Sequence, residues 1–274
     1  MTSIPSLALS LVLTCCGSAL LAHEVWIEAD QWQTAQGDTI SAQVLNGEQM
    51  VGIQLPWDPT SIARAQSWTG DANTSLAGRY GDIPALSAPS APEGLLTLEY
   101  QTLPRTVIYT DFKKFSGFLA EKGWTEILAR HSSRNLPEVR IKEAFSRFTK
   151  ALVAVGDGAG SDAARGLEFE IVALDNPYTA EPGTDMRFQI YYRGALLTDN
   201  LVTMFERAPG GTVTTSTKET GPEGTVSFGT QAGHTYLIDS VYMREPDREL
   251  FIQTQGALWE SLWASLTFHV PASQ

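Results

Sequence analysis

Cysteine is almost absent from this chain, because its 274 residues contain only Cys15 and Cys16, which are adjacent and close to the start. Neighbouring cysteines near one end cannot cross-link a core. A disulfide scaffold, an iron–sulfur site, a cysteine-ligated zinc site and a cysteine nucleophile in the body of the chain are therefore excluded. The chain also lacks a phosphate-binding loop and any motif that joins a nucleophile to its base. The sequence does not predict an enzyme, and acid–base catalysis by its many carboxylates is the weakest of three alternatives.

Basic residues are also scarce, with 19 Lys and Arg against 31 Asp and Glu and a net charge of -12. A chain this acidic is a poor ligand for nucleic acid, which is bound through clustered Lys and Arg. The charge is uneven along the sequence, with -8 over 23–103, +4 over 104–165 and -8 over 166–274. We expect the basic segment to be a solvated, amphipathic one that packs on its acidic neighbours.

Long apolar runs are missing beyond the first 22 residues, so we expect no membrane span in the rest of the chain. Residues 1–22 carry no charge, and their apolar core is too short for a span, which is typical of a signal peptide. Cleavage after Ala22 would make His23 the first mature residue, and cleavage after Ala19 would leave Leu20 instead. The sequence thus predicts an exported protein whose mature chain has no thiol.

The distribution of strand and turn signals predicts a mainly β protein with two β-sandwich-like domains joined by a helical segment. The expected order is signal peptide 1–22, N-terminal β-domain 23–110, helical segment 111–156, linker 157–166 and C-terminal β-sandwich 167–274. Seven short strands in the last segment suggest an immunoglobulin-like or transthyretin-like sandwich. Trp26, Trp259 and Trp263 are expected to be core residues.

Three helices are predicted within the helical segment. Phe112, Phe115, Phe118 and Leu119 recur at helical spacing after Asp111, which is a suitable N-cap. Further helices are expected over 124–131 and 139–155, and a flexible connector follows.

Histidine is the residue from which a metal site can be argued. None of the four histidines pairs as HxH or HxxxH, so no two-histidine ligand set is visible. If His23 opens the mature chain, however, its α-amino group and imidazole can chelate one ion, with Glu24 as an assisting ligand. Val25 stands third in that chain where an albumin-like terminal site needs histidine. The alternative is that His23 only makes surface contacts at the start of a strand.

Several motifs in order resemble one exported family. HEVWIE follows the signal peptide (23–28), and KALVAVG (150–156), LEFEIVALDNPY (167–178), YRGALL (192–197) and WESLWASLTF (259–268) follow along the chain. Together they resemble the periplasmic component of nickel/cobalt uptake systems, a family of unknown-function domains with a transthyretin-like C-terminal half. The resemblance covers essentially the whole mature chain.

The resemblance implies a periplasmic accessory protein that binds nickel or cobalt, with copper or zinc as other candidates, and that serves a membrane uptake transporter. It makes His23 the primary ligand. Tyr242 stands where many members have histidine, and Glu260 and His269 are further candidate ligands. The alternative function is a non-catalytic cell-envelope module that binds a membrane partner or a glycan.

Overall fold

A computed structural model describes residues 23–89, 91–181 and 183–272, and the predicted signal peptide lies outside these residues. The fold is mainly β, as expected. The strands are β1 (Glu24–Ala29), β2 (Gln33–Thr34), β3 (Ile40–Glu48), β4 (Val51–Leu55), β5 (Ile62–Thr69), β6 (Ala72–Ser75), β7 (Leu86–Ala88), β8 (Gly94–Thr102), β9 (Arg105–Tyr109), β10 (Ile141–Val155), β11 (Phe169–Ala173), β12 (Asp185–Tyr192), β13 (Ala195–Leu196), β14 (Leu201–Arg207), β15 (Val213–Glu219), β16 (Thr225–Gly229), β17 (Thr235–Arg244) and β18 (Trp259–His269). The helices are α1 (Phe112–Glu121), α2 (Glu126–Ser133) and α3 (Arg248–Gln253). No helix in the described ranges has the length and apolar character that crossing a bilayer requires.

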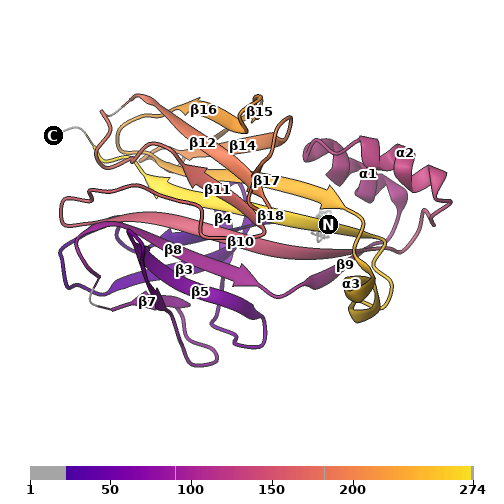
Figure 1. The fold of residues 1–274 in the computed structure, drawn as a ribbon, viewed down its shortest axis with the longest axis horizontal. Helices are drawn as coiled ribbons and strands as arrows, with labels where there is room; N and C mark the ends of the chain where they lie inside the picture. The colour runs from indigo at the N-terminus through magenta and orange to yellow at the C-terminus, as the bar shows by residue number, and fades with distance from the viewer. Residues whose placement is uncertain (1–22, 90, 182, 273–274) are drawn as a thin grey trace, which may run out of the picture.

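One long sheet joins the two halves of the chain. Its strand order is β15-β14-β17-β18-β10-β8-β5-β6, and β2 and β9 also pair with β10. Strand β10 runs parallel to β18 and antiparallel to β8 and β9. Apart from the two-residue β2, which lies on the β18 side, N-terminal strands extend from one side of β10 and C-terminal strands from the other, as the indigo and orange halves of Figure 1 show. The predicted halves share this sheet instead of being joined only by a connector.

Two smaller sheets cover opposite faces of the shared one. The first has the order β1-β3-β4, with β7 on β3, and the second the order β11-β12-β13, with β16 on β12. Alternate side chains of β10 enter different cores, because neighbouring residues of a strand point to opposite faces. Val153 and Val155 pack with the N-terminal sheet, whereas Phe148 and Leu152 pack with the C-terminal one.

The prediction of a helix over 139–155 is wrong, because this segment is strand β10. Both of its faces are covered, so the sequence does not alternate between apolar and polar residues as a half-exposed strand does. Its charged residues were taken for the polar face of a helix, yet Glu143, Arg147 and Lys150 are all buried. The 15-residue length also favoured a helix, since most strands are shorter.

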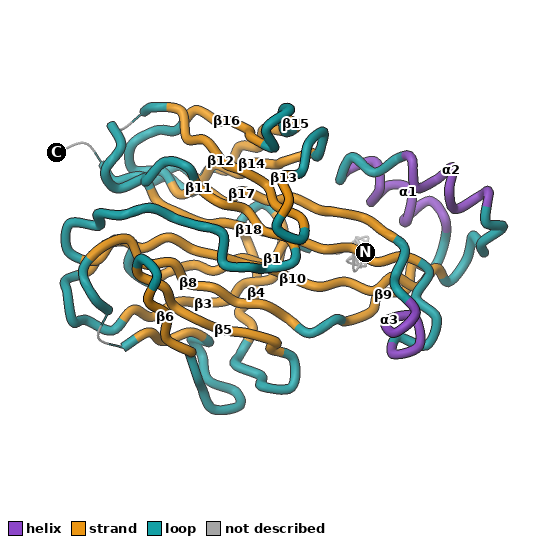
Figure 2. The backbone as a smooth tube through the Cα atoms, viewed as in Figure 1, coloured by secondary structure: helices purple, strands orange, loops and turns teal. Residues whose placement is uncertain are grey.

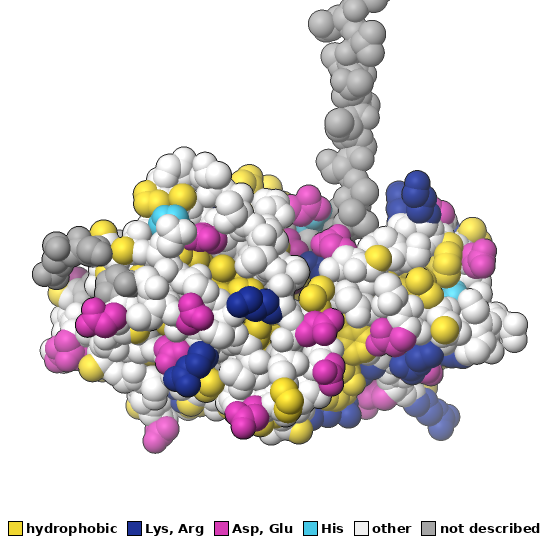
Figure 3. All heavy atoms as spheres, turned by 90° about the horizontal axis from the view of Figure 1, so that it is seen from above, with side chains coloured by type: hydrophobic (Ala, Val, Ile, Leu, Met, Phe, Trp, Pro, Cys, Tyr) yellow, Lys and Arg dark blue, Asp and Glu magenta, His cyan; other side chains and the backbone are white. Residues whose placement is uncertain are grey.

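The other two predicted helices are confirmed as α1 and α2, which lie at one end of the long sheet (Figures 1 and 2). The Asp111 side chain accepts a hydrogen bond from the backbone of Lys114, so it is the expected N-cap. Phe118 stacks on Trp263 at 5.7 Å between ring centroids. Figure 3 shows Lys and Arg side chains mostly toward this helical end of the face it displays, with acidic side chains scattered over the whole face.

The predicted linker has no regular secondary structure but is fastened to the body of the protein. Asp162 is buried and accepts a hydrogen bond from Nζ of Lys150 at 2.8 Å. The same ammonium group lies 3.2 Å from Oε1 of Glu170. The segment is thus anchored by an ion pair inside the protein and is not the loose connector that its Gly and Ala content indicated.

Candidate functional site

His23 lies directly before β1, and the pairing of β1 with β3 decides which side chain stands beside it. Glu24 pairs with Gly47 in this antiparallel register, so His23 comes opposite Glu48. Nδ1 of His23 lies 2.9 Å from Oε1 of Glu48. The nitrogen is buried and has no partner with hydrogen-bond geometry among the described residues. A carboxylate oxygen and an imidazole nitrogen are therefore close together.

Glu24 points elsewhere, because successive side chains of a strand lie on opposite faces. Its carboxylate is buried and accepts a hydrogen bond from Nζ of Lys122 at 2.7 Å. The expectation that Glu24 assists His23 is thus corrected: Glu48 is the carboxylate beside the imidazole.

The remaining predicted ligands are not brought to His23. Tyr242 stacks on Tyr192, with 4.2 Å between ring centroids. Glu260 binds the guanidinium of Arg244 through both of its oxygens, at 2.6 and 2.8 Å. Tyr242 and Glu260 thus contact other side chains of the protein.

His269 lies near the far end of β18, where Nδ1 is 3.2 Å from Oγ1 of Thr235 and burial lowers the pKa of the imidazole. Nine residues of one strand separate it from Glu260, which corresponds to about 30 Å. One ion cannot reach both residues. Within the described ranges, no group of three or more His, Cys, Asp and Glu side chains is arranged to hold a metal ion.

His23 also lines a cavity of about 670 Å³, which we call the His23 cavity. It lies between the start of β1, the end of β4, and strands β8, β9 and β10. Its apolar wall includes Val25, Leu55, Val107, Ile108 and Phe145. Its polar lining includes Ser61, Thr102, Arg105 and Arg147. A cavity of this size, mostly apolar with a few polar groups, is typical of small-molecule sites.

A buried ionic cluster adjoins this cavity at Arg147. Lys122 bridges Glu24 and Asp239, with Nζ 3.4 Å from Oδ2 of Asp239. Burial by itself would lower the pKa of Lys122, but the carboxylates of Asp239 and Glu24 outweigh it and raise that pKa. Burial raises the pKa of Asp239 to about 6, and the neighbouring Lys122 opposes only part of this effect.

Two further groups of the cluster come from β10. Burial raises the pKa of Glu143 to about 7, against the effect of a hydrogen bond from Ser261. Burial also lowers the pKa of Arg147 to about 10, so the guanidinium stays charged near neutral pH. The cluster therefore holds ionisable groups that titrate close to neutrality beside a permanent cation.

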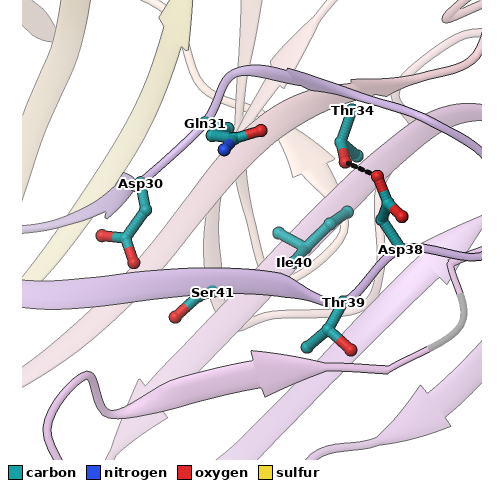
Figure 4. A pocket seen from close by; sticks show the side chains of 7 residues that line it. All are labelled: Asp30, Gln31, Thr34, Asp38, Thr39, Ile40 and Ser41. Carbon is teal, nitrogen blue, oxygen red and sulfur yellow. Dashed lines mark hydrogen bonds between the residues drawn. The ribbon is translucent and has the colours of Figure 1, made fainter.

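A second hollow, drawn in Figure 4, contains the carboxylates of Asp30 and Asp38. Asp38 accepts a hydrogen bond from Oγ1 of Thr34 at 3.1 Å, and Asp30 accepts one from Gln43 at 3.2 Å. Figure 4 shows the two acidic side chains on opposite sides of Ile40. They do not converge on one point, so this hollow does not offer the paired acids that acid–base catalysis uses.

Residues 20–244 match the family model of a domain of unknown function, DUF4198. The chain belongs to the DUF4198 family. A comparison of this DUF4198 chain with curated proteins finds no match.

Two solved structures are similar to this DUF4198 chain over most of its length. One is a tetra-tandem repeat in the extending region of a large adhesion protein, with 12% identity and a TM-score of 0.20. That match covers 90% of this chain and 49% of the other, so the chain spans about half the length of that structure. The other is the D0-D1 domain of intimin, with 10% identity, a TM-score of 0.24 and coverage of 89% and 97%. TM-scores this low do not indicate a shared fold.

Three residues of the site region were missed by the sequence reasoning. Glu48 could be found only from the register of β1 and β3, which a single sequence does not supply. Arg147 falls in the segment 139–155 that the sequence predicts as a helix, and Asp239 lies within the ten-residue strand β17 without a recognisable motif. A charged residue inside an otherwise apolar strand is the signal that would have singled out Arg147 and Asp239.

Proposed function

We propose that this DUF4198 protein is a periplasmic accessory that binds a divalent transition-metal ion, nickel or cobalt, for uptake or delivery. Cleavage after Ala22 would free the α-amino group of His23. The amine and Nδ1 would chelate the ion, and Glu48 would supply a carboxylate oxygen. The observation that carries this proposal is the 2.9 Å between Nδ1 of His23 and Oε1 of Glu48, without a hydrogen bond on that nitrogen.

The donor set fits a borderline cation. An α-amine with a pKa of about 7.7–8.0 gives up its proton to a metal near neutral pH, and imidazole and carboxylate complete a nitrogen–oxygen set. Three protein donors leave positions for water or an exchanging ligand. The side chains of His23 and Glu48 are 24% and 58% exposed, so an ion could enter and leave. These properties suit cargo that is passed on better than a permanent structural ion.

The export, the periplasmic location and the transporter partner rest on the signal-like start and on the resemblance to nickel/cobalt uptake components. We also keep the finer fold description as part of this proposal. The two halves are sandwich-like, the C-terminal one transthyretin-like, and each has its own hydrophobic cluster on one face of β10.

Calorimetric titration of Ni²⁺ and Co²⁺ into the chain beginning at His23 tests the site. We expect His23→Ala to weaken the tightest binding by at least about tenfold, and Glu48→Gln to weaken it less. A chain that retains Ala22 should lose affinity as well, because its histidine amine is then part of a peptide bond. Asp38→Asn is the matched control for loss of an acid, and should bind as the wild type does.

Equal affinity in the wild type and in His23→Ala would contradict the assignment. Mass spectrometry of the exported protein gives an independent check, since a mature chain beginning at Leu20 would rule out the amine chelate.

A cell-envelope interaction module is the second candidate function, and one observation favours it. Strand β4 lies at the edge of its sheet, and Val51 and Ile53 on it are 75% and 69% exposed. An apolar edge strand can pair with an extended segment of a partner. Absence of Ni²⁺ and Co²⁺ binding, together with co-purification of a membrane complex that is lost in Ile53→Lys, would favour this function over metal binding.

A further inference from the structure

Arg147 is a buried arginine whose hydrogen-bonding capacity is unused by the protein. Its side chain is 4% exposed, and Nε and Nη1 have no acceptor among the described residues. Its backbone N–H donates a hydrogen bond to Oγ1 of Thr102 at 3.0 Å. Buried donors without an acceptor destabilise a protein by about 1–3 kcal/mol, and more when they are charged. A buried arginine with unpaired donors is therefore a candidate for binding a ligand.

The charged neighbours of Arg147 balance its charge but do not bind it. Asp239 and Glu24 are the carboxylates that act most strongly on its charge, and both are held by Lys122. Glu143, on the same strand, accepts a hydrogen bond from Ser261. The guanidinium instead lies over aromatic rings, 3.9 Å from the centroid of Trp263 and 5.2 Å from that of Phe145. These rings orient its plane and leave its donors free.

Arg147 is also among the residues that line the His23 cavity. Thr102 and Ser61 add hydroxyl groups to the lining, and Arg105 adds a second, more exposed cation whose charge is paired with Asp58, 3.7 Å away. The remainder of the wall is largely apolar, with Phe145 beside the arginine and Val107 farther along, opposite Glu143 in the sheet. The cavity therefore combines one buried cation with a surface that suits hydrocarbon.

We infer that the His23 cavity binds a small organic carboxylate, with its carboxylate group on Arg147 and its apolar body against Val107 and Phe145. A guanidinium presents paired donors that match the two oxygens of a carboxylate. A single buried guanidinium neutralises one negative charge, and the apolar wall favours a ligand with a hydrocarbon part over inorganic phosphate. The inference does not rest on the metal proposal, because Arg147 and His23 come from different strands and can be changed separately.

Calorimetric titration with benzoate in metal-free buffer tests the inference, with benzyl alcohol and inorganic phosphate as comparison probes. We expect benzoate to bind the wild type at least about tenfold more tightly than either comparison probe. Arg147→Met should lose at least about tenfold in benzoate affinity, whereas the surface variant Arg130→Met should bind as the wild type does. His23→Ala should retain benzoate binding even if it no longer binds nickel.

A cavity-filling variant guards against the case in which Arg147→Met does not fold. Val107→Trp keeps the arginine and occupies the space of the ligand, so it should abolish benzoate binding. The inference is overturned if benzoate does not bind the wild type, if benzyl alcohol or phosphate binds as well as benzoate, or if benzoate binding survives both Arg147→Met and Val107→Trp.

Discussion

Lys150 and Arg147 are two buried cations on the same strand, yet their surroundings differ completely. Their side chains lie on opposite faces of β10, because their positions in the strand differ by three, an odd number. Nζ of Lys150 contacts carboxylate oxygens of Asp162 and Glu170 and the backbone oxygens of Ala163 and Ile171, all within 3.3 Å. The guanidinium of Arg147 has rings around it and open donors. A fully satisfied buried cation fixes the fold, whereas an unsatisfied one is available to a ligand.

The largest loss of stability is expected when Lys150, the cation whose charge is paired, is replaced. Lys150→Met leaves Asp162 and Glu170 buried without their cation, and we expect the free energy of unfolding to fall by about 3–5 kcal/mol. Urea denaturation followed by tryptophan fluorescence measures this change. Lys113→Met, on the exposed surface of α1, is the matched control and should change stability by less than about 0.5 kcal/mol. A loss below about 1 kcal/mol in Lys150→Met would mean that the ion pair does not hold the 157–166 segment.

An effect on stability of intermediate size, which depends on pH, is expected at Glu143, on the same face of β10 as Arg147. Burial raises the pKa of Glu143 to about 7, so the folded state holds this proton more tightly than the unfolded state does. The stability from protonated Glu143 is therefore present below about pH 4 and is lost as pH rises toward 7. Subtracting the stability curve of Glu143→Gln from that of the wild type should show a decline of about 1–3 kcal/mol across this range. A flat difference curve would show that Glu143 does not titrate in that interval.

The smallest effect on stability is expected when Arg147 is replaced, although it is a buried cation like Lys150. Arg147→Met removes donors that have no acceptor among the described residues, so we expect the free energy of unfolding at pH 7 to change by less than about 1 kcal/mol. Asp239, whose pKa is already about 6, can take up a proton if the nearby cation is lost. A loss as large as that of Lys150→Met, in the same denaturation experiment, would remove the contrast between the two cations.

The sequence predicted elements whose pattern is local and failed where long-range pairing decides. Helix α1 and its N-cap Asp111 follow from spacing within one short segment. Strands β14 and β17, among others in the C-terminal half, follow from alternation between turn residues. Strand β10 could not be recognised, because its faces are covered by sheets from distant parts of the chain. Whether a charged residue is solvated or buried then depends on partners that the local sequence does not contain.

The candidate site shows the same division. His23 could be singled out because its proposed role depends on its place in the chain. Its neighbour Glu48 is set by the β1–β3 register, and the choice of Glu24 failed because adjacent residues of a strand diverge. Glu260 and His269 were grouped by sequence motif and position, but an extended strand separates them too widely to share one ion.

The parallel pair at the centre of the sheet has a consequence for folding. Glu143 pairs with Trp259, so this side of β10 is completed by β18, a strand that is remote in the sequence. Pairings this distant in sequence form slowly, because a large loop must close before any contact rewards it. A chain synthesised from its N-terminus therefore keeps residues 143–151 of β10 unpaired on that side until β18 is available. In the export that we propose, such a delay would keep the polypeptide threadable through a translocation channel and would place completion of the sheet after passage.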